Sequence, residues 1–179
     1  MAPRQALIDH LRAHSLRTDG PFRLASGAVA DWYMDARQTT FSGTGSVLVA
    51  QAVLEVLDPQ VEAVGGMTMG ADPIAVATAT HSGGRLDAFS IRKAEKDHGA
   101  GGRLVGPVGP GRRVAVLEDT TTTGRAFLEA IDVAESAGLV VVQAISLFDR
   151  SGGTVGTSMA SRSIPYVALV LPEDLGVEL

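Results

Sequence analysis

One short segment of the chain gathers several residue types that could do chemistry together. An apolar run, Val114–Leu117, is followed by Glu118 and Asp119, by four threonines and by Gly124. Such a run is typical of a strand buried on both faces of a parallel sheet, and open α/β sheets bind ligands where their strands end. Threonine hydroxyls and the N–H groups of a helix starting here could hold a phosphate, while the carboxylates suit sugar hydroxyls or a metal ion. The segment therefore predicts a sugar-phosphate site.

A simpler interpretation of the same segment stays open. A strand that ends in acidic residues and threonines can be an ordinary βα loop in which Thr123 caps the next helix. That interpretation accounts for one threonine and one carboxylate, and it leaves the rest of the run unexplained. A Walker-type phosphate loop would need a lysine that this segment lacks.

Three further segments could add to such a site. Residues 65–73 form a glycine-rich stretch after a predicted strand, where backbone could approach an anion closely. The stretch from Arg92 to Gly102 is basic and rich in glycine, and cations closing over a pyrophosphate would stabilise the charge of a departing leaving group. Arg150 follows another apolar strand, and an arginine fork pairs well with a carboxylate. The alternatives are a solvated hairpin for the basic loop and a surface ion pair with Asp149 or Glu173 for Arg150.

The elements that must position these residues alternate along the chain. Hydrophobic periodicity and turn residues predict helices over 2–16, 43–57, 73–81, 124–137 and near 157, and strands over 22–24, 32–35, 61–64, 86–91, 114–117, 140–147 and 166–171. Alternation of this kind predicts an α/β fold with a mostly parallel sheet flanked by helices. Residues 1–40 or so stand outside the alternation and are expected to form a small lid packed on the core of a single domain spanning 1–179.

Composition narrows the class of protein. The chain has 179 residues, 45% of them hydrophobic and 20% charged, as expected for one globular domain. A net charge of −5 argues against a nucleic-acid partner, and the absence of cysteine fits a reducing compartment such as the cytoplasm. Charged residues near the N-terminus argue against a signal peptide, and no stretch is long and apolar enough to predict a membrane span.

Taken in order, these segments resemble the type I phosphoribosyltransferases, and among them the orotate phosphoribosyltransferases. The resemblance runs from about Phe22 to Gly153. It is carried by Phe22-Arg23-Leu24-Ala25-Ser26-Gly27 with Asp31-Trp32-Tyr33-Met34-Asp35-Ala36-Arg37, by Arg92-Lys93-Ala94-Glu95-Lys96-Asp97-His98-Gly99, by Glu118–Gly124, and by Asp149-Arg150 with Gly152-Gly153. The Arg-Lys-x-x-Lys-x-His-Gly segment is the one that points to orotate rather than to a purine base.

The resemblance implies a role for each matching residue. It implies transfer of a phosphoribosyl group from phosphoribosyl pyrophosphate (PRPP) to orotate, with Lys93, Lys96, His98 and Asp119 as the catalytic residues. The PRPP site would comprise Arg92, Lys93, Lys96, His98, Glu118, Asp119, Thr120, Thr121, Thr122, Thr123, Gly124, Arg125 and Ala126. Thr122 and Arg150 would bind orotate. Apart from the resemblance, Ser26, Gly27 and Tyr33 could line the base pocket from the lid, although a tyrosine in a short strand is more often a packing residue.

The same resemblance implies a cofactor and an assembly. Mg²⁺ is expected to be held mainly through the substrate rather than by protein ligands. The chain would form a homodimer with shared active sites, in which Arg92, Lys96 and His98 reach the partner's PRPP while Lys93 serves its own.

The chain also departs from the family pattern. Ala25 and Gly70 stand where many relatives carry lysine, which removes two anion contacts. Two other functions stay open: a phosphoribosyltransferase for another base, and a PRPP-sensing regulator that keeps the loop without the chemistry.

Overall fold

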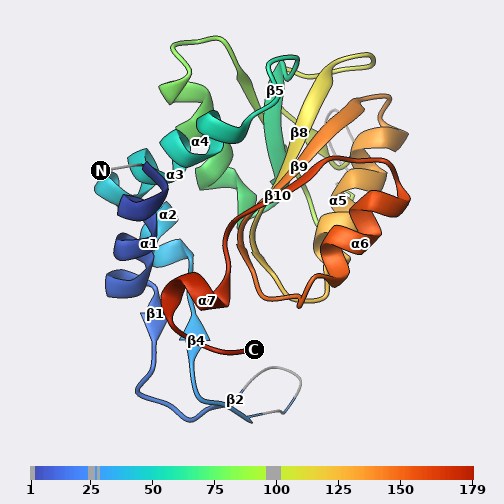
Figure 1. Ribbon diagram of the computed structural model, residues 1–179. Helices are drawn as coiled ribbons and strands as arrows, with labels where there is room; N and C mark the ends of the chain where they lie inside the picture. The colour runs from blue at the N-terminus through green and yellow to red at the C-terminus, as the bar shows by residue number, and fades with distance from the viewer. Residues whose placement is uncertain (1–2, 24–26, 28, 96–101) are drawn as a thin grey trace.

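The computed structural model describes residues 3–23, 27, 29–95 and 102–179. Its centre is a six-stranded sheet in the order β10-β9-β8-β5-β6-β7 (Figure 1). The strands are β5 (Ala63–Met67), β6 (Asp87–Ile91), β7 (Leu104–Val105), β8 (Arg113–Thr121), β9 (Val140–Asp149) and β10 (Tyr166–Val170). All neighbours pair in parallel except β6 and β7, which are antiparallel. The predicted α/β fold with a mostly parallel sheet is confirmed.

Helices cover both faces of the sheet (Figure 1). They are α3 (Gly43–Val56) and α4 (Ala71–His81) on one side, and α5 (Arg125–Ser136) and α6 (Thr154–Ser161) on the other. Successive residues of β8 point to opposite faces, so Leu117 packs with Ile74 in one cluster and Val116 packs with Phe127 in the second. Burial on both faces explains why the strands read as continuous apolar runs.

The N-terminal part forms a small hood beside this core (Figure 1). Its elements are α1 (Pro3–His14), β1 (Leu16–Arg17), β2 (Phe22–Arg23), β3 (Val29–Ala30), β4 (Tyr33–Met34) and α2 (Arg37–Thr40), with β1 pairing β4 and β2 pairing β3. Helix α1 buries Leu7, Ile8 and Leu11. The short helix α7 (Pro172–Leu175) ties the end of the chain to the hood, because Arg4 pairs with Asp174 at 2.6 Å.

Several predicted boundaries were wrong. Strand β8 does not stop at Leu117: its pairing with β9 continues through Thr121, so both carboxylates belong to the strand and the loop is shorter than expected. The helix predicted near 157 is present as α6, which spans Thr154–Ser161. The short elements β1, β3, β7, α2 and α7 were missed, because two to four residues give no measurable periodicity. Among the described residues, no helix combines the length and hydrophobicity that crossing a membrane requires.

Candidate active site

The sheet reverses its direction of growth between β5 and β8. From β5 the chain passes through α4 to β6 on one side, and later returns to β8 on the other side of β5. Ligands bind at such switch points, outside the carboxyl ends of the strands. Here the turn after β5 meets the end of β8 closely: a Cβ atom on Gly70 would lie 2.5 Å from Oδ1 of Asp119. Gly70 therefore leaves the space that the Asp119 carboxylate occupies.

A small cavity opens where β8 passes into α5. It has a volume of about 180 Å³ and is lined by Glu118 and by residues 120–127. Gly124 makes the turn possible, since its φ of 72° lies in the left-handed region that favours glycine. The first turn of α5 then presents backbone N–H groups that have no partner within the helix. This is the arrangement that holds a phosphate group at a helix start.

The threonines of this loop do not all face the cavity in the same way. Thr122 and Thr123 are exposed, whereas the Thr121 side chain is 2% exposed and its hydroxyl lies 2.9 Å from Ser146 Oγ. Thr123 is not the N-cap residue of α5, which is Gly124, although its Oγ1 accepts a hydrogen bond from the Arg125 nitrogen at 3.4 Å. Of the four threonine hydroxyls, that of Thr121 is therefore the least available to a ligand, and Thr122 and Thr123 are the most exposed.

Glu118 is the most perturbed carboxyl group of the site. It is 7% exposed, and its Oε2 has no hydrogen-bond partner among the described residues. Burial first, and then the neighbouring Asp119 charge, raise the pKa of Glu118 from 4.5 to about 8, while the positive charge of Lys93 acts in the opposite direction. A carboxyl group in this state binds a proton readily, or a hydroxyl or cation supplied by a ligand.

Arg150 lies next to this loop at the end of β9. Its backbone nitrogen donates to the Thr121 carbonyl at 2.8 Å. Neither expected ion pair is present within the described part of the chain: Asp149 instead accepts from Tyr166 Oη at 2.8 Å and from the Ser151 nitrogen at 2.7 Å. Partial burial lowers the pKa of Arg150. The guanidinium is thus placed for an anionic ligand instead of a neighbouring carboxylate.

Comparison with known proteins identifies the family. Over 179 residues, 98% of each chain, the sequence is 40% identical to the orotate phosphoribosyltransferase of Streptomyces avermitilis. The Mycobacterium tuberculosis orotate phosphoribosyltransferase in complex with PRPP superimposes with a TM-score of 0.82 and 30% identity, covering 98% of this chain and 99% of that one. The chain belongs to the orotate phosphoribosyltransferase family. No family model matches it.

A more distant structure separates fold from base preference. The adenine phosphoribosyltransferase of Leishmania donovani superimposes with a TM-score of 0.67 at 15% identity, covering 94% of this chain and 81% of that one. At that identity the likeness concerns the fold alone. A shared fold therefore does not by itself fix which base a protein of this fold uses.

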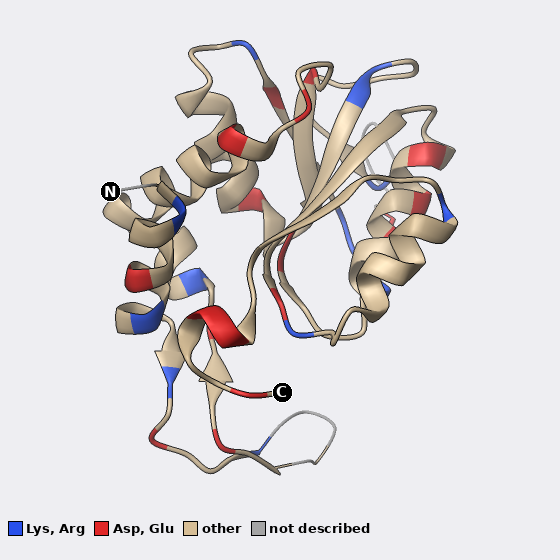
Figure 2. Ribbon diagram, viewed as in Figure 1, with Lys and Arg blue, Asp and Glu red and all other residues tan. Residues whose placement is uncertain are grey.

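Two of the family's loop cations can be placed and two cannot. Arg92 and Lys93 follow β6 at the same edge of the sheet as Glu118, and Lys93 is exposed. Lys96 and His98, predicted as catalytic and PRPP-binding, lie outside the described residues. Acidic and basic residues are interspersed along the described elements (Figure 2). The electrostatic potential at the site therefore depends mainly on the charged residues closest to it, such as Arg92 and Lys93.

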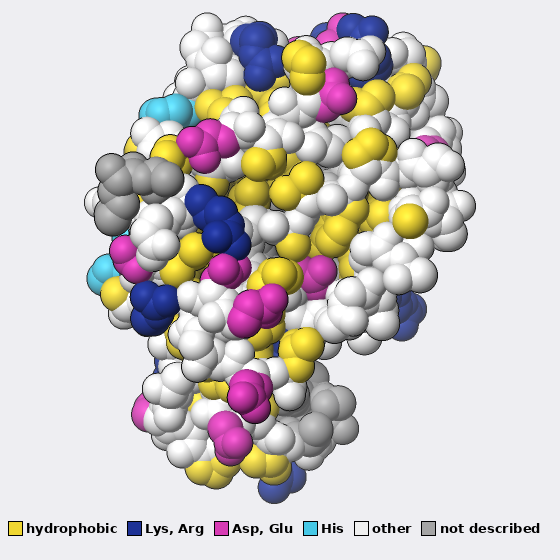
Figure 3. Space-filling model, in the orientation of Figure 1, with side chains coloured by type: hydrophobic (Ala, Val, Ile, Leu, Met, Phe, Trp, Pro, Cys, Tyr) yellow, Lys and Arg dark blue, Asp and Glu magenta, His cyan; other side chains and the backbone are white. Residues whose placement is uncertain are grey.

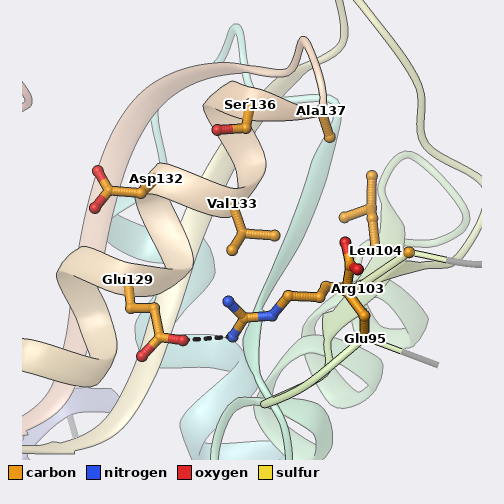
Figure 4. Close-up of a pocket in the computed structure, with 9 residues that line it drawn as sticks. Glu95, Arg103, Leu104, Glu129, Asp132, Val133, Ser136 and Ala137 are labelled. Atoms are coloured by element: carbon orange, nitrogen blue, oxygen red, sulfur yellow. Dashed lines mark hydrogen bonds and ion pairs between the residues drawn. The ribbon is translucent and has the colours of Figure 1, made fainter. Parts of the chain in front are cut away.

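The base of this loop is held by Arg103, a member of the basic segment whose contacts the sequence did not predict. Arg103 donates to the Arg92 carbonyl at 2.6 Å and to Glu129 of α5 at 2.6 Å (Figure 4). It borders a cavity of about 480 Å³ whose apolar wall includes Leu104 and Val133. Arg103 thus connects the basic loop to α5, the helix that begins at the cavity lined by Glu118 and residues 120–127. We call this cavity the phosphate cradle. Because Arg103 and Glu129 are 26 residues apart in the sequence, only the folded structure reveals this role.

Proposed function

We propose that this chain transfers the 5-phosphoribosyl group of PRPP to N1 of orotate, giving orotidine 5′-monophosphate and pyrophosphate in pyrimidine (UMP) biosynthesis. The bond from ribose C1 to the pyrophosphate oxygen breaks, the bond from C1 to N1 forms, and the N1 proton is taken up by the released pyrophosphate. The observation that carries the proposal is the adjacency of two anion sites. The phosphate cradle and Arg150 are joined by the hydrogen bond from the Arg150 nitrogen to the Thr121 carbonyl.

Each part of the cradle has a distinct role in this reaction. The loop from Thr122 to Ala126 binds the 5-phosphate through hydroxyls and backbone N–H groups. Glu118 and Asp119 bind the ribose hydroxyls, which supply the partners that the buried Glu118 carboxyl lacks. The negative charge of Asp119 also favours the positive charge that develops on the sugar as the pyrophosphate leaves C1.

The basic loop acts on the leaving group. Lys93, Lys96, His98 and Arg92 stabilise the pyrophosphate as it gains negative charge, and closure of the loop excludes water. Catalysis is then a matter of positioning and charge, with no covalent nucleophile. Lys93→Ala is expected to reduce turnover far more than PRPP affinity.

Mg²⁺ fits the site as a partner of the substrate. Among the described residues, no group of three or more metal-ligating side chains is present. Mg²⁺ usually needs only one or two carboxylates besides phosphate oxygens and water, so it would be carried mainly by PRPP. When bound, it would neutralise charge on the pyrophosphate.

A homodimer is part of the proposal. Four apolar side chains between 36% and 60% exposed, on and beside α2, α3 and α4, support it: Phe41, Val47, Met69 and Val76. Figure 3 shows further apolar side chains among charged ones across the middle of the viewed face.

Two inactive variants would test the shared site, Lys96→Ala in the loop and Asp119→Asn in the cradle. Mixed after dissociation, they should regain about a quarter of wild-type activity if each site uses both chains.

The base panel decides between this function and its rivals. Orotate, uracil, adenine, guanine and xanthine are offered in parallel with PRPP and Mg²⁺, and product is measured. Consumption of orotate alone supports the proposal. Turnover of another base keeps the fold and discards the role of Arg150, and PRPP binding without any turnover leaves a sensor. The cytoplasm remains the predicted compartment.

A further inference from the structure

Trp32 lies where three parts of the chain meet. It precedes β4 in the hood, is 8% exposed, and carries the guanidinium of Arg150 over its ring at 4.2 Å from the ring centroid. Its Nε1 donates to the Glu178 carbonyl at 2.8 Å, and its edge meets the Phe148 ring at 6.0 Å and 82°. Hood, sheet and the final residues of the chain therefore fix the indole from three sides.

The same three parts enclose a cavity of about 620 Å³. Arg150 and Trp32 line it together with residues 29–31 of the hood, Thr18 and residues 177–179. In Figure 1 the end of the chain runs past α7 to lie close to β4. The cavity therefore lies at the hood's junction with the end of β9, next to the phosphate cradle.

The stacking geometry decides what Arg150 can still bind. A guanidinium that lies over an aromatic face is attracted by the ring quadrupole, and its in-plane N–H groups remain free. Those groups form the fork that pairs with a carboxylate through two parallel hydrogen bonds. Asp149, the nearest acidic residue in sequence, already accepts from Tyr166 and Ser151. Among the described residues no other group forms a hydrogen bond or ion pair with the Arg150 guanidinium, so the fork is available to a ligand in the cavity.

We infer that Trp32 is a positioning residue for base recognition. It holds Arg150 flat, so that the guanidinium edge meets the carboxylate of the base, and residues 177–179 hold Trp32 through the Glu178 carbonyl. The inference rests on the proposed function, since it concerns how the same site selects its base. It assigns to the hood and the final residues of the chain a part in base specificity and none in PRPP binding.

The experiment uses the fact that Trp32 is the single tryptophan of the chain. Growth with mono-, di- and trifluorinated tryptophan alters this one ring and weakens its attraction for a cation stepwise, while its N–H group is retained. The KM for orotate is expected to rise in the same steps, by about five- to thirty-fold at full loss of the attraction. The KM for PRPP is expected to stay constant. Binding of orotate should also quench the fluorescence of wild-type Trp32.

Two controls make the outcome specific. Trp32→Phe protein from the same fluorinated media contains no labelled residue, so its KM for orotate must be independent of the medium. That variant also loses the donor to Glu178, and its KM for orotate should exceed that of wild type. Equal orotate KM values across the fluorinated series would overturn the inference and leave the proposed function intact. A wild type that consumes no orotate would overturn both.

Discussion

Replacing Glu118 by glutamine tests the electrostatics of the cradle most sharply. Glutamine mimics the protonated carboxyl in size and shape, and it cannot ionise. The pKa of Glu118 is raised from 4.5 to about 8 in the folded chain. The folded state therefore holds this proton more tightly than the unfolded state, so wild-type stability must fall as pH rises through that window.

The size of the effect follows from the same two values. At about 1.4 kcal/mol per pH unit, the gap corresponds to a loss of about 5 kcal/mol once the carboxyl is fully ionised in the fold. Since the buried Oε2 has no partner to offset ionisation among the described residues, we expect about 3–5 kcal/mol in practice.

Urea unfolding of both proteins from about pH 5 to about pH 9 measures this loss. The stability of Glu118→Gln relative to wild type should rise steadily with pH and level off above about pH 8. The exposed Glu173→Gln is the matched control and should leave the wild-type profile unchanged. If the free energies of unfolding of wild type and Glu118→Gln fall in parallel as pH rises, the pKa of the buried carboxyl is not raised, and the electrostatics described for the cradle are wrong.

Three further outcomes follow from single contacts. Arg150→Ala should lower kcat/KM for orotate about 10- to 150-fold, the worth of a charge-assisted hydrogen bond, with PRPP binding retained; equal losses for both substrates in initial-rate kinetics would argue against a base contact. Gly70→Ala places a Cβ within 2.6 Å of the Asp119 carboxyl carbon, so kcat/KM for PRPP should fall about tenfold. An unchanged value would show that the Asp119 side chain can move aside without loss of activity. Arg103→Gln removes the ion pair with Glu129 and should lower kcat several-fold in the same assay, while the distant Arg113→Gln should not.

Much of the site could be predicted from the sequence because it is built from contiguous segments. The run from Glu118 to Gly124 carries its own strand end, acidic pair and helix start, so its place at the sheet edge follows from local pattern alone. Arg150 was also predictable, since an apolar strand delivers it to the same edge.

Contacts between residues far apart in the chain could not be predicted from the sequence. Trp32 meets Arg150 and Glu178 across more than 100 residues, and no periodicity encodes that meeting. Tyr33, expected as the aromatic wall, packs on Phe22 at 5.9 Å, and its neighbour Trp32 is the residue that faces Arg150. Trp32 lies just before β4 and Tyr33 lies within it, and the two neighbouring rings contact different partners.

The most direct test of the central claim follows both products of the reaction in one vessel. Purified protein, Mg²⁺, PRPP and orotate are mixed, and orotidine 5′-monophosphate and pyrophosphate are quantified over time beside Lys93→Ala. The account predicts equal amounts of both products from the wild type, with turnover strongly reduced in the variant and PRPP still bound. Pyrophosphate released without the nucleotide, or no reaction with orotate at all, would contradict it.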